Sequence, residues 1–217
     1  MKLGIVGCKG RMGLALEHII RDSEVDSCVY SKDEEYEIVN DTPDCLIDFS
    51  SRSALSSTFH KAQEFHCPVI IGTTGLQDDD YKLIHTMSEK IAIMYNSNYS
   101  IGIHLINRML KTLGKETKGW SINIIEIHHT GKKDKPSGTA LSLSESFQKD
   151  VPIHSLRMKG VPGEHEIILS NNDEIIRLRH SVYSRSVFPR GAIECAHWIT
   201  NQNVGSGLYS LNDMSEH

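Results

Sequence analysis

Residues 2–20 read KLGIVGCKGRMGLALEHII, and this stretch decides the fold. Its apolar run Leu3–Val6 is typical of a short buried strand, and glycines follow at positions 7, 10 and 13. From Met12 to Ile20, apolar side chains recur at helical intervals. A strand, a glycine turn and a helix in this order are typical of the first unit of a dinucleotide-binding domain.

The same alternation continues over the first hundred residues. We expect strands at Cys28–Tyr30, Cys45–Phe49, Val69–Ile71 and Ile91–Tyr95. Between the later strands, helical spacing appears at Leu55, Phe59 and Ala62, and again at Tyr81, Ile84 and Met87. Repeated strand–helix–strand units predict a parallel sheet with helices on both faces and right-handed connections. The predicted class is therefore α/β, with a Rossmann-like dinucleotide-binding domain.

The alternation breaks after about residue 98. The pattern then predicts a long helix at Ile101–Leu113, an isoleucine-rich strand at Ser121–Ile127, a helix at Ala140–Phe147, strands at Glu166–Leu169 and Ile175–His180, and a helix at Gly191–Thr200. Strands and helices in this irregular order are typical of an α+β domain. We expect one domain at residues 1–99 and 185–217, and a second domain at residues 100–184 inserted into it.

Composition excludes several classes of protein. The chain has 217 residues, 39% of them hydrophobic and 24% charged, which is ordinary for a soluble globular protein. Its 23 Lys and Arg against 28 Asp and Glu give a net charge of −5, which argues against nucleic-acid binding. No apolar run is long enough to span a membrane. Five scattered cysteines without a CxxC pair favour a reducing, cytoplasmic location over a disulfide framework.

The glycine loop is the first candidate site. Gly7 permits a tight turn, Gly10 lets backbone amides approach a pyrophosphate, and Gly13 lets the helix lie close to the strand. A tight structural turn is the alternative. At the end of the second strand, Lys32 would tolerate the 2′-phosphate of NADPH, whereas Asp33 would bind the ribose of NADH. Lys32 also fits a solvated surface position, so the choice between NADH and NADPH stays open.

The densest chemistry lies in residues 126–140, EIHHTGKKDKPSGTA. Two histidines and three lysines precede a Ser-Gly-Thr segment that opens a helix, where Ser137 or Thr139 can cap the free amides. Imidazoles carry protons near pH 7, and lysines attract carboxylates, so the segment suits proton-coupled chemistry on a small dicarboxylate. Lys133 and Lys135 also fit a solvated turn. We expect no metal, because no cysteine completes a zinc set beside the histidines.

This segment resembles the signature of the 4-hydroxy-tetrahydrodipicolinate (dihydrodipicolinate) reductase family. Other motifs of that family occur in the same order: GxxGRMG at 7–13, IDFS at 47–50, GTTG at 72–75, NYSxG at 98–102, GEH at 163–165 and SRxxFxxGA at 184–192. The resemblance runs from residue 3 to about 208. It implies a Rossmann-like domain completed by the C-terminal tail, and a central α+β domain whose mixed sheet assembles a homotetramer.

The resemblance also implies residue roles. His128 and Lys132 would be catalytic, and the substrate carboxylates would be bound by His129, Gly138 and Thr139. The dinucleotide, NADH or NADPH, would be bound by Gly7, Cys8, Lys9, Gly10, Arg11, Met12, Lys32, Gly72, Thr73, Thr74, Asn96, Ser97, Asn98, Tyr99 and Arg185. The reaction implied is reduction of an unsaturated dicarboxylate ring in diaminopimelate and lysine biosynthesis. Two alternatives are another NAD(P)-dependent reductase on a similar frame, and a non-catalytic dinucleotide-sensing module.

Overall fold

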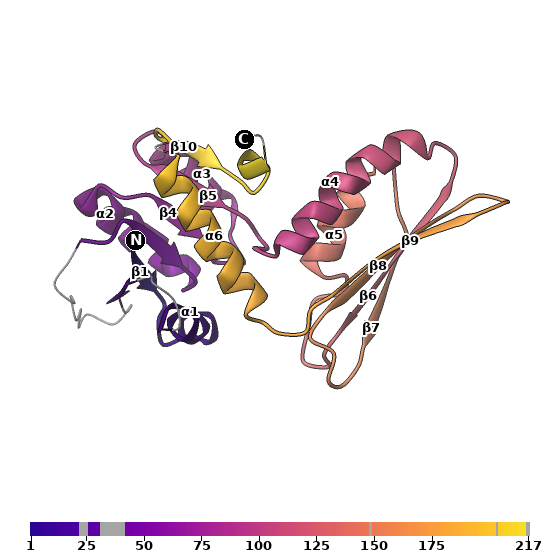
Figure 1. Ribbon diagram of the computed structural model, residues 1–217, viewed down its shortest axis with the longest axis horizontal. Helices are drawn as coiled ribbons and strands as arrows, with labels where there is room; N and C mark the ends of the chain where they lie inside the picture. Colours follow the sequence, from indigo (N-terminus) through magenta and orange to yellow (C-terminus); the bar gives the residue numbers. More distant parts are fainter. Residues whose placement is uncertain (22–25, 31–41, 148, 203, 216–217) are drawn as a thin grey trace. The chain divides into compact units, whose positions relative to one another are not determined.

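A computed structural model describes residues 1–21, 26–30, 42–147, 149–202 and 204–215 of the chain (Figure 1). It divides into two compact units, one formed by Met1–Tyr99 with Ser186–His217 and the other by Ser100–Arg185. Arg185 therefore belongs to the second unit, whereas the expected boundary assigned it to the first. Across these described ranges, no helix is both long and apolar enough to cross a membrane.

The first unit is built on a six-stranded sheet with the strand order β10-β5-β4-β3-β1-β2 (Figure 1). All neighbouring strands pair in parallel, so their carboxyl ends meet at one edge. The strands are β1 (Lys2–Val6), β2 (Asp26–Tyr30), β3 (Cys45–Asp48), β4 (Val69–Ile71), β5 (Ala92–Tyr95) and β10 (Gly207–Tyr209). The expected Rossmann-like α/β class is confirmed, and the C-terminal strand β10 completes the sheet beside β5.

In the described part of this unit, the helices that cover the sheet are α1 (Arg11–Arg21), α2 (Leu55–Phe65), α3 (Asp78–Ser88) and α6 (Val187–Asn201), with short 3₁₀ turns at Arg52–Ala54 and Asp213–Ser215. Helix α6 contacts α1 and strands β3, β4 and β5, while α2 contacts β3 and α3. Every residue of β3 and β4 is buried, as expected for parallel strands covered on both faces.

The burial predicted from the apolar spacing of α3 is only partly correct. Ile84 and Met87 pack into the core beside Phe59 and Ile93, as the spacing predicts. Tyr81 was expected on the same face, but 39% of it is exposed, and its hydroxyl lies 3.2 Å from that of Tyr95. Tyrosine can remain at the margin of a core because its ring packs while its hydroxyl reaches a polar partner.

The second unit is a four-stranded mixed sheet with the order β7-β6-β8-β9, packed against two helices (Figure 1). Strand β6 pairs in parallel with β7 and antiparallel with β8, which pairs antiparallel with β9. The elements are α4 (Ile101–Glu116), β6 (Ser121–His128), α5 (Gly138–Glu145), β7 (Ile153–Arg157), β8 (Glu164–Ser170) and β9 (Ile175–Ser181). Strand β7 was not expected from the sequence.

Strand β6 shows how this unit combines a core with a polar site. Its residues alternate strictly in burial, and Ile122 and Ile124 pack with Leu110, Leu143 and Ile167. Because side chains alternate with a period of two, the next buried positions of β6 lie on the same face. Those positions are a glutamate and a histidine, so the apolar face ends in a buried polar pair.

Candidate functional site

The loop between β1 and α1 requires its glycines. Gly7 has φ +87°, and a Cβ there would lie 2.8 Å from the Cα of Ser50. A Cβ on Gly13 would lie 2.4 Å from both the Gly7 carbonyl oxygen and the Cα of Cys8. The Gly10 amide donates a 2.9 Å hydrogen bond to the Gly7 carbonyl and closes the turn. The loop therefore approaches its neighbours as closely as the dinucleotide-binding turn requires.

The start of α1 fits an anionic group such as a pyrophosphate. The first amides of a helix have no intrahelical partner and carry the positive end of the helix dipole. Lys9 and Arg11 are exposed at this end, and the first turn holds no acidic residue. Cys8 is only 4% exposed, and burial raises the pKa of its thiol, so its contribution to a cofactor is limited to its backbone.

Asp48, at the carboxyl end of β3, connects the loop after β3 to the candidate cofactor loop after β4. It is fully buried, and its Oδ1 accepts hydrogen bonds from the Ser50 amide at 2.8 Å, the Ser50 hydroxyl at 2.6 Å and the Thr73 hydroxyl at 2.9 Å. Its Oδ2 accepts a further bond from the Thr58 hydroxyl at 2.6 Å. Asp48 is not among the residues predicted for the site, although a carboxylate within the apolar run CLIDF indicates a buried polar group.

Several other predicted cofactor residues have side chains committed to the fold. The Tyr99 ring is 2% exposed, and its hydroxyl donates to the Ile71 carbonyl at 2.8 Å, so it packs inside the unit. The Thr73 hydroxyl is held by Asp48, and Gly72 lies under the Phe49 ring, where a Cβ would be 2.0 Å from Cε1.

The remaining members of the predicted cofactor set are more open. The Asn96 side chain accepts a hydrogen bond from the Leu211 amide at 3.2 Å. Thr74 and Ser97 are exposed, and Asn98 is half-buried. Lys32 lies outside the described residues. These loops all follow carboxyl ends of parallel strands, the edge at which open α/β sheets bind ligands.

In the second unit, α5 begins at the Ser-Gly-Thr segment as expected. Ser137 is the N-cap, and its hydroxyl accepts a 3.2 Å hydrogen bond from the Ala140 amide. Gly138 and Thr139 occupy the first turn, and a Cβ built on Gly138 meets nothing within 4 Å among the described atoms. There is therefore open space beside Gly138, whose amide is hydrogen-bonded to the Asp134 carboxylate, so this helix start already holds one carboxylate.

His128 is the last residue of β6 and is 9% exposed. Its Nδ1 is hydrogen-bonded to the carboxylate of Glu126, which is completely buried and also accepts a 2.9 Å bond from Arg157. Burial raises the pKa of Glu126, but hydrogen bonds from Arg157, Ser155 and His128 outweigh it and lower the pKa to about 2. Burial also lowers the pKa of His128, although Glu126 acts in the opposite direction.

Lys132 lies on the loop after His128, and its Nζ is 2.9 Å from the Asp134 carboxylate. Burial raises the pKa of Asp134, but the hydrogen bond and charge of Lys132 lower it overall. The flanking Lys133 and Lys135 are exposed, in keeping with a solvated turn. The loop therefore distinguishes one partly shielded ammonium group from two lysines that face water.

His129 points to a different partner from His128. Its Nε2 lies 3.2 Å from the guanidinium of Arg185, which had been assigned to the cofactor side. Both residues belong to the second unit, so the structure groups Arg185 with the predicted substrate residues. An arginine beside an imidazole favours binding of a carboxylate.

His165, in the GEH segment on β8, received no role from the sequence. Its ring makes an edge-to-face contact with His128, with centroids 5.1 Å apart, and its Nε2 lies 3.4 Å from the Ser137 hydroxyl. Burial, together with the charges of His128 and His180, lowers its pKa to about 3. His165 is therefore neutral near pH 7 and adds no positive charge beside His128.

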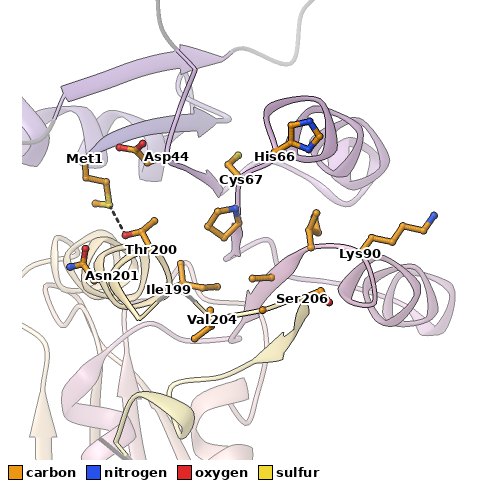
Figure 2. Close-up of a pocket in the computed structure, with 14 residues that line it drawn as sticks. Met1, Asp44, His66, Cys67, Lys90, Ile199, Thr200, Asn201, Val204 and Ser206 are labelled. Atoms are coloured by element: carbon orange, nitrogen blue, oxygen red, sulfur yellow. Dashed lines mark hydrogen bonds between the residues drawn. The ribbon is translucent and has the colours of Figure 1, made fainter.

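A cavity of about 700 Å³ lies elsewhere in the first unit (Figure 2). Its walls include Asp44, Cys67, Lys90 and Thr200, which precede β3, β4 and β5 or lie near the end of α6. The cavity is thus at the amino ends of the strands, whereas ligands of open parallel sheets bind at the carboxyl ends. It is distinct from the glycine loop.

A parallel sheet with a glycine turn after its first strand, together with a second unit that carries a capped helix start and a buried histidine–carboxylate pair, is the arrangement of an oxidoreductase of the two-domain dehydrogenase class. Residues 1–99 match the family model "Dihydrodipicolinate reductase, N-terminus", and residues 102–214 match "Dihydrodipicolinate reductase, C-terminus". The chain belongs to the dihydrodipicolinate reductase family, which confirms the resemblance seen in its motifs.

Relatives over the full chain agree with this assignment. A 4-hydroxy-tetrahydrodipicolinate reductase of Thermosipho africanus is 38% identical over 99% of this chain and 97% of its own length. The enzyme of that name from Bdellovibrio bacteriovorus is 34% identical over 99% of this chain and 96% of its own. A dipicolinate-bound dihydrodipicolinate reductase from Paenisporosarcina sp. TG-14 shares the fold, with TM-score 0.77, 22% identity and 97% coverage of both chains.

Proposed function

We propose that this chain catalyses the NAD(P)H-dependent reduction of 4-hydroxy-tetrahydrodipicolinate to tetrahydrodipicolinate. The observation that carries the proposal is the loop of the second unit, which follows His128, holds Lys132 by an ion pair with Asp134 and leads into the capped start of α5. The names of the full-length relatives support the same reaction. The reaction belongs to diaminopimelate and lysine biosynthesis.

The first unit would bind NADH or NADPH. The amides of Arg11 and Met12, at the start of α1, would bind the pyrophosphate, with the exposed Lys9 and Arg11 side chains adding positive charge. When bound, the reduced nicotinamide supplies a hydride to C4 of the substrate ring. The buried Thr73 and Tyr99 side chains would hold the shape of the neighbouring loops, since their hydroxyls are bonded to Asp48 and Ile71.

The second unit would bind the two carboxylates of the substrate. The first-turn amides of Gly138 and Thr139 would donate hydrogen bonds to one carboxylate, which would take the place of Asp134 at the Gly138 amide. His129 with Arg185 would attract negative charge nearby. Two fixed anion sites orient a planar ring, because each carboxylate then has one place to bind. Orientation of this kind is a large part of what a protein contributes to a transfer reaction.

Lys132 and His128 would supply the proton. The 4-hydroxyl leaves as water, and reduction at C4 raises the electron density on the conjugated imine side of the ring, where the ammonium group of Lys132 donates a proton. Asp134 holds that ammonium by an ion pair of 2.9 Å. His128, with its Nδ1 on the side of Glu126, would exchange protons with the site through its other nitrogen.

We also propose that the chain works in the cytoplasm as a homotetramer assembled through its second unit. Large apolar side chains of that unit are exposed, including Leu156 at 48%, Ile175 at 59% and Tyr183 at 94%. Exposed apolar side chains of this size are typical of surfaces that another chain covers. Light scattering of the purified protein gives the test, and a monomeric mass at micromolar concentration would contradict it.

A coupled assay tests the proposed function. The synthase that produces the substrate generates it in situ, and oxidation of NADH or NADPH is followed by absorbance. Turnover that depends on both the synthase and the chain is the expected result. Turnover with a different substrate, such as aspartate semialdehyde, would favour another reductase, and NADH binding without turnover on any substrate would favour a non-catalytic module.

A further inference from the structure

We propose that Glu126 and Arg157 are positioning residues, which fix the tautomer of His128 and the backbone that carries Lys132. The inference rests on the proposed function, in which His128 and Lys132 transfer protons. Neither Glu126 nor Arg157 is placed to touch a substrate: the glutamate is completely buried, and the arginine side chain is 8% exposed. Both act through the groups that they bind.

The first part of the argument concerns the imidazole. Glu126 precedes His128 by two residues on β6, so their side chains share one face, and the carboxylate meets Nδ1. A carboxylate whose pKa is about 2 is ionised near pH 7 and can only accept, so Nδ1 must carry the proton. In the neutral imidazole, Nε2 is then the acceptor. It faces Gly163, where a Cβ would lie 3.2 Å away, so the absence of a side chain there leaves room beside Nε2.

The second part concerns the guanidinium of Arg157. Strand β7 pairs with β6 so that Arg157 lies directly opposite His128. Its Nη1 donates to Glu126 at 2.9 Å, its Nε donates to the Lys132 carbonyl at 3.2 Å, and its Nη2 donates to the Asp134 carbonyl. One planar group thus joins the carboxylate behind the imidazole to the backbone carbonyl of Lys132 itself and to that of Asp134, the ion-pair partner of Lys132.

The charges around His128 are consistent with this role. The groups that face it are Glu126 on its own strand, Arg157 on β7, His165 on β8 and Lys132 on the loop. Burial lowers the pKa of His128, the carboxylate raises it, and the two cations lower it. His165 stays neutral near pH 7, because its pKa is about 3. Arg157 neutralises Glu126, so the pair can remain buried while the imidazole exchanges a proton.

If Glu126 and Arg157 were only a structural ion pair, their replacement would have a different effect from the one expected for positioning residues. A buried pair replaced on both sides by apolar residues of similar volume often leaves stability unchanged. The matched replacement, E126M/R157M, removes the acceptor for Nδ1 and the donors to the loop together. The control, E166M/R177M, removes another carboxylate–guanidinium pair of the same unit, with its 2.9 Å contact between β8 and β9.

The experiment combines ¹⁵N NMR of histidine-labelled protein, thermal unfolding and the coupled assay. The His128 signals are assigned by their loss in His128→Asn. We expect wild type and the control to hold His128 with Nδ1 protonated. In E126M/R157M we expect that preference to be lost, and kcat to fall about 100-fold, with NADH binding and unfolding temperature close to wild type.

The outcomes separate the inference from the proposed function. An unchanged tautomer or an unchanged kcat in E126M/R157M would overturn the positioning role. An inactive wild type would overturn the proposed function alone, because the tautomer is read without turnover. If the double variant unfolds, Arg157→Lys provides the test, since an ammonium cannot bind a carboxylate and two loop carbonyls in the same fork. We then expect about a 10-fold lower kcat, and wild-type kcat would refute the loop contact.

Discussion

Gly13→Ala tests the packing of the glycine loop quantitatively. The added Cβ would lie 2.4 Å from the Gly7 carbonyl oxygen and 2.6 Å from the Cys8 carbonyl oxygen. Ordinary van der Waals contact begins at 3.4 Å, so the start of α1 would have to move by roughly 1 Å. The obstructing atoms belong to the backbone and cannot turn away as a flexible side chain would. We therefore expect the overpacking cost to lie near the upper part of its range, about 3 kcal/mol.

A compensating term reduces this cost. Gly13 is the third residue of α1, and alanine favours a helix over glycine by up to about 1 kcal/mol. The net loss of unfolding free energy is therefore about 2 kcal/mol, or about 4–8 °C in Tm for a chain of this size. A displacement of about 1 Å in the amides of the loop should also weaken NADH binding by about 10-fold or more.

The assays are thermal unfolding and NADH fluorescence titration, with Gly205→Ala as the control. Gly205 belongs to the same unit, and a Cβ there meets nothing within 4 Å among the described atoms. We expect the control to keep wild-type Tm and NADH affinity. A Gly13→Ala variant with wild-type values for both would refute the close approach of α1 to the loop.

Three further predictions concern the second unit. Lys132→Ala should lower kcat by about 10²–10⁴-fold while NADH binding by fluorescence stays near wild type, and near-normal turnover would rule out its role as proton donor. Thr139→Val should raise the inhibition constant of pyridine-2,6-dicarboxylate, and an unchanged constant would argue against its hydroxyl while leaving its amide in place. The folded pKa of His165 is about 3, below its ordinary value of 6.5, so the unfolded chain binds the extra proton between these values. The free energy of unfolding should be highest above pH 6.5 and fall by up to about 1.4 kcal/mol per pH unit toward pH 3. Unfolding measured across this pH range should show a smaller slope in His165→Gln, and an unaltered slope would contradict the low pKa of His165.

The elements that the sequence predicted best have strong local patterns. The run at β1, the glycines after it and the spacing of α1 are set by side chains within about 20 residues of one another. Strand β7 was missed because its burial is weak and alternating and it includes a histidine, a serine and an arginine. The local pattern did not predict strand β10, which has only three residues, although the family resemblance implied that the C-terminal tail completes this domain. Both strands exist through pairing with distant strands, which a local pattern does not report.

The candidate site divides in the same way. His128, Lys132 and the start of α5 lie within one short segment, so their chemistry could be read from the residue types and their order. The burial of Tyr99 could not be predicted from the sequence, because its hydroxyl is hydrogen-bonded to a carbonyl 28 residues away. The place of Arg157 at the site could not be predicted either, because the residue that it contacts, Glu126, lies 31 positions away in the sequence.

The amino-acid sequence alone was sufficient to predict a dinucleotide-binding domain, an inserted α+β domain and a loop with acid–base groups. These features depend on glycine conformation, hydrophobic periodicity and helix capping, which act over a few residues. The tertiary structure determined which of those side chains are held by other residues of the chain. It buried Thr73 against Asp48, grouped Arg185 with His129 and placed a buried ion pair behind His128. Burial and long-range hydrogen bonds determine protonation and orientation, and they arise only when strands distant in the sequence become neighbours.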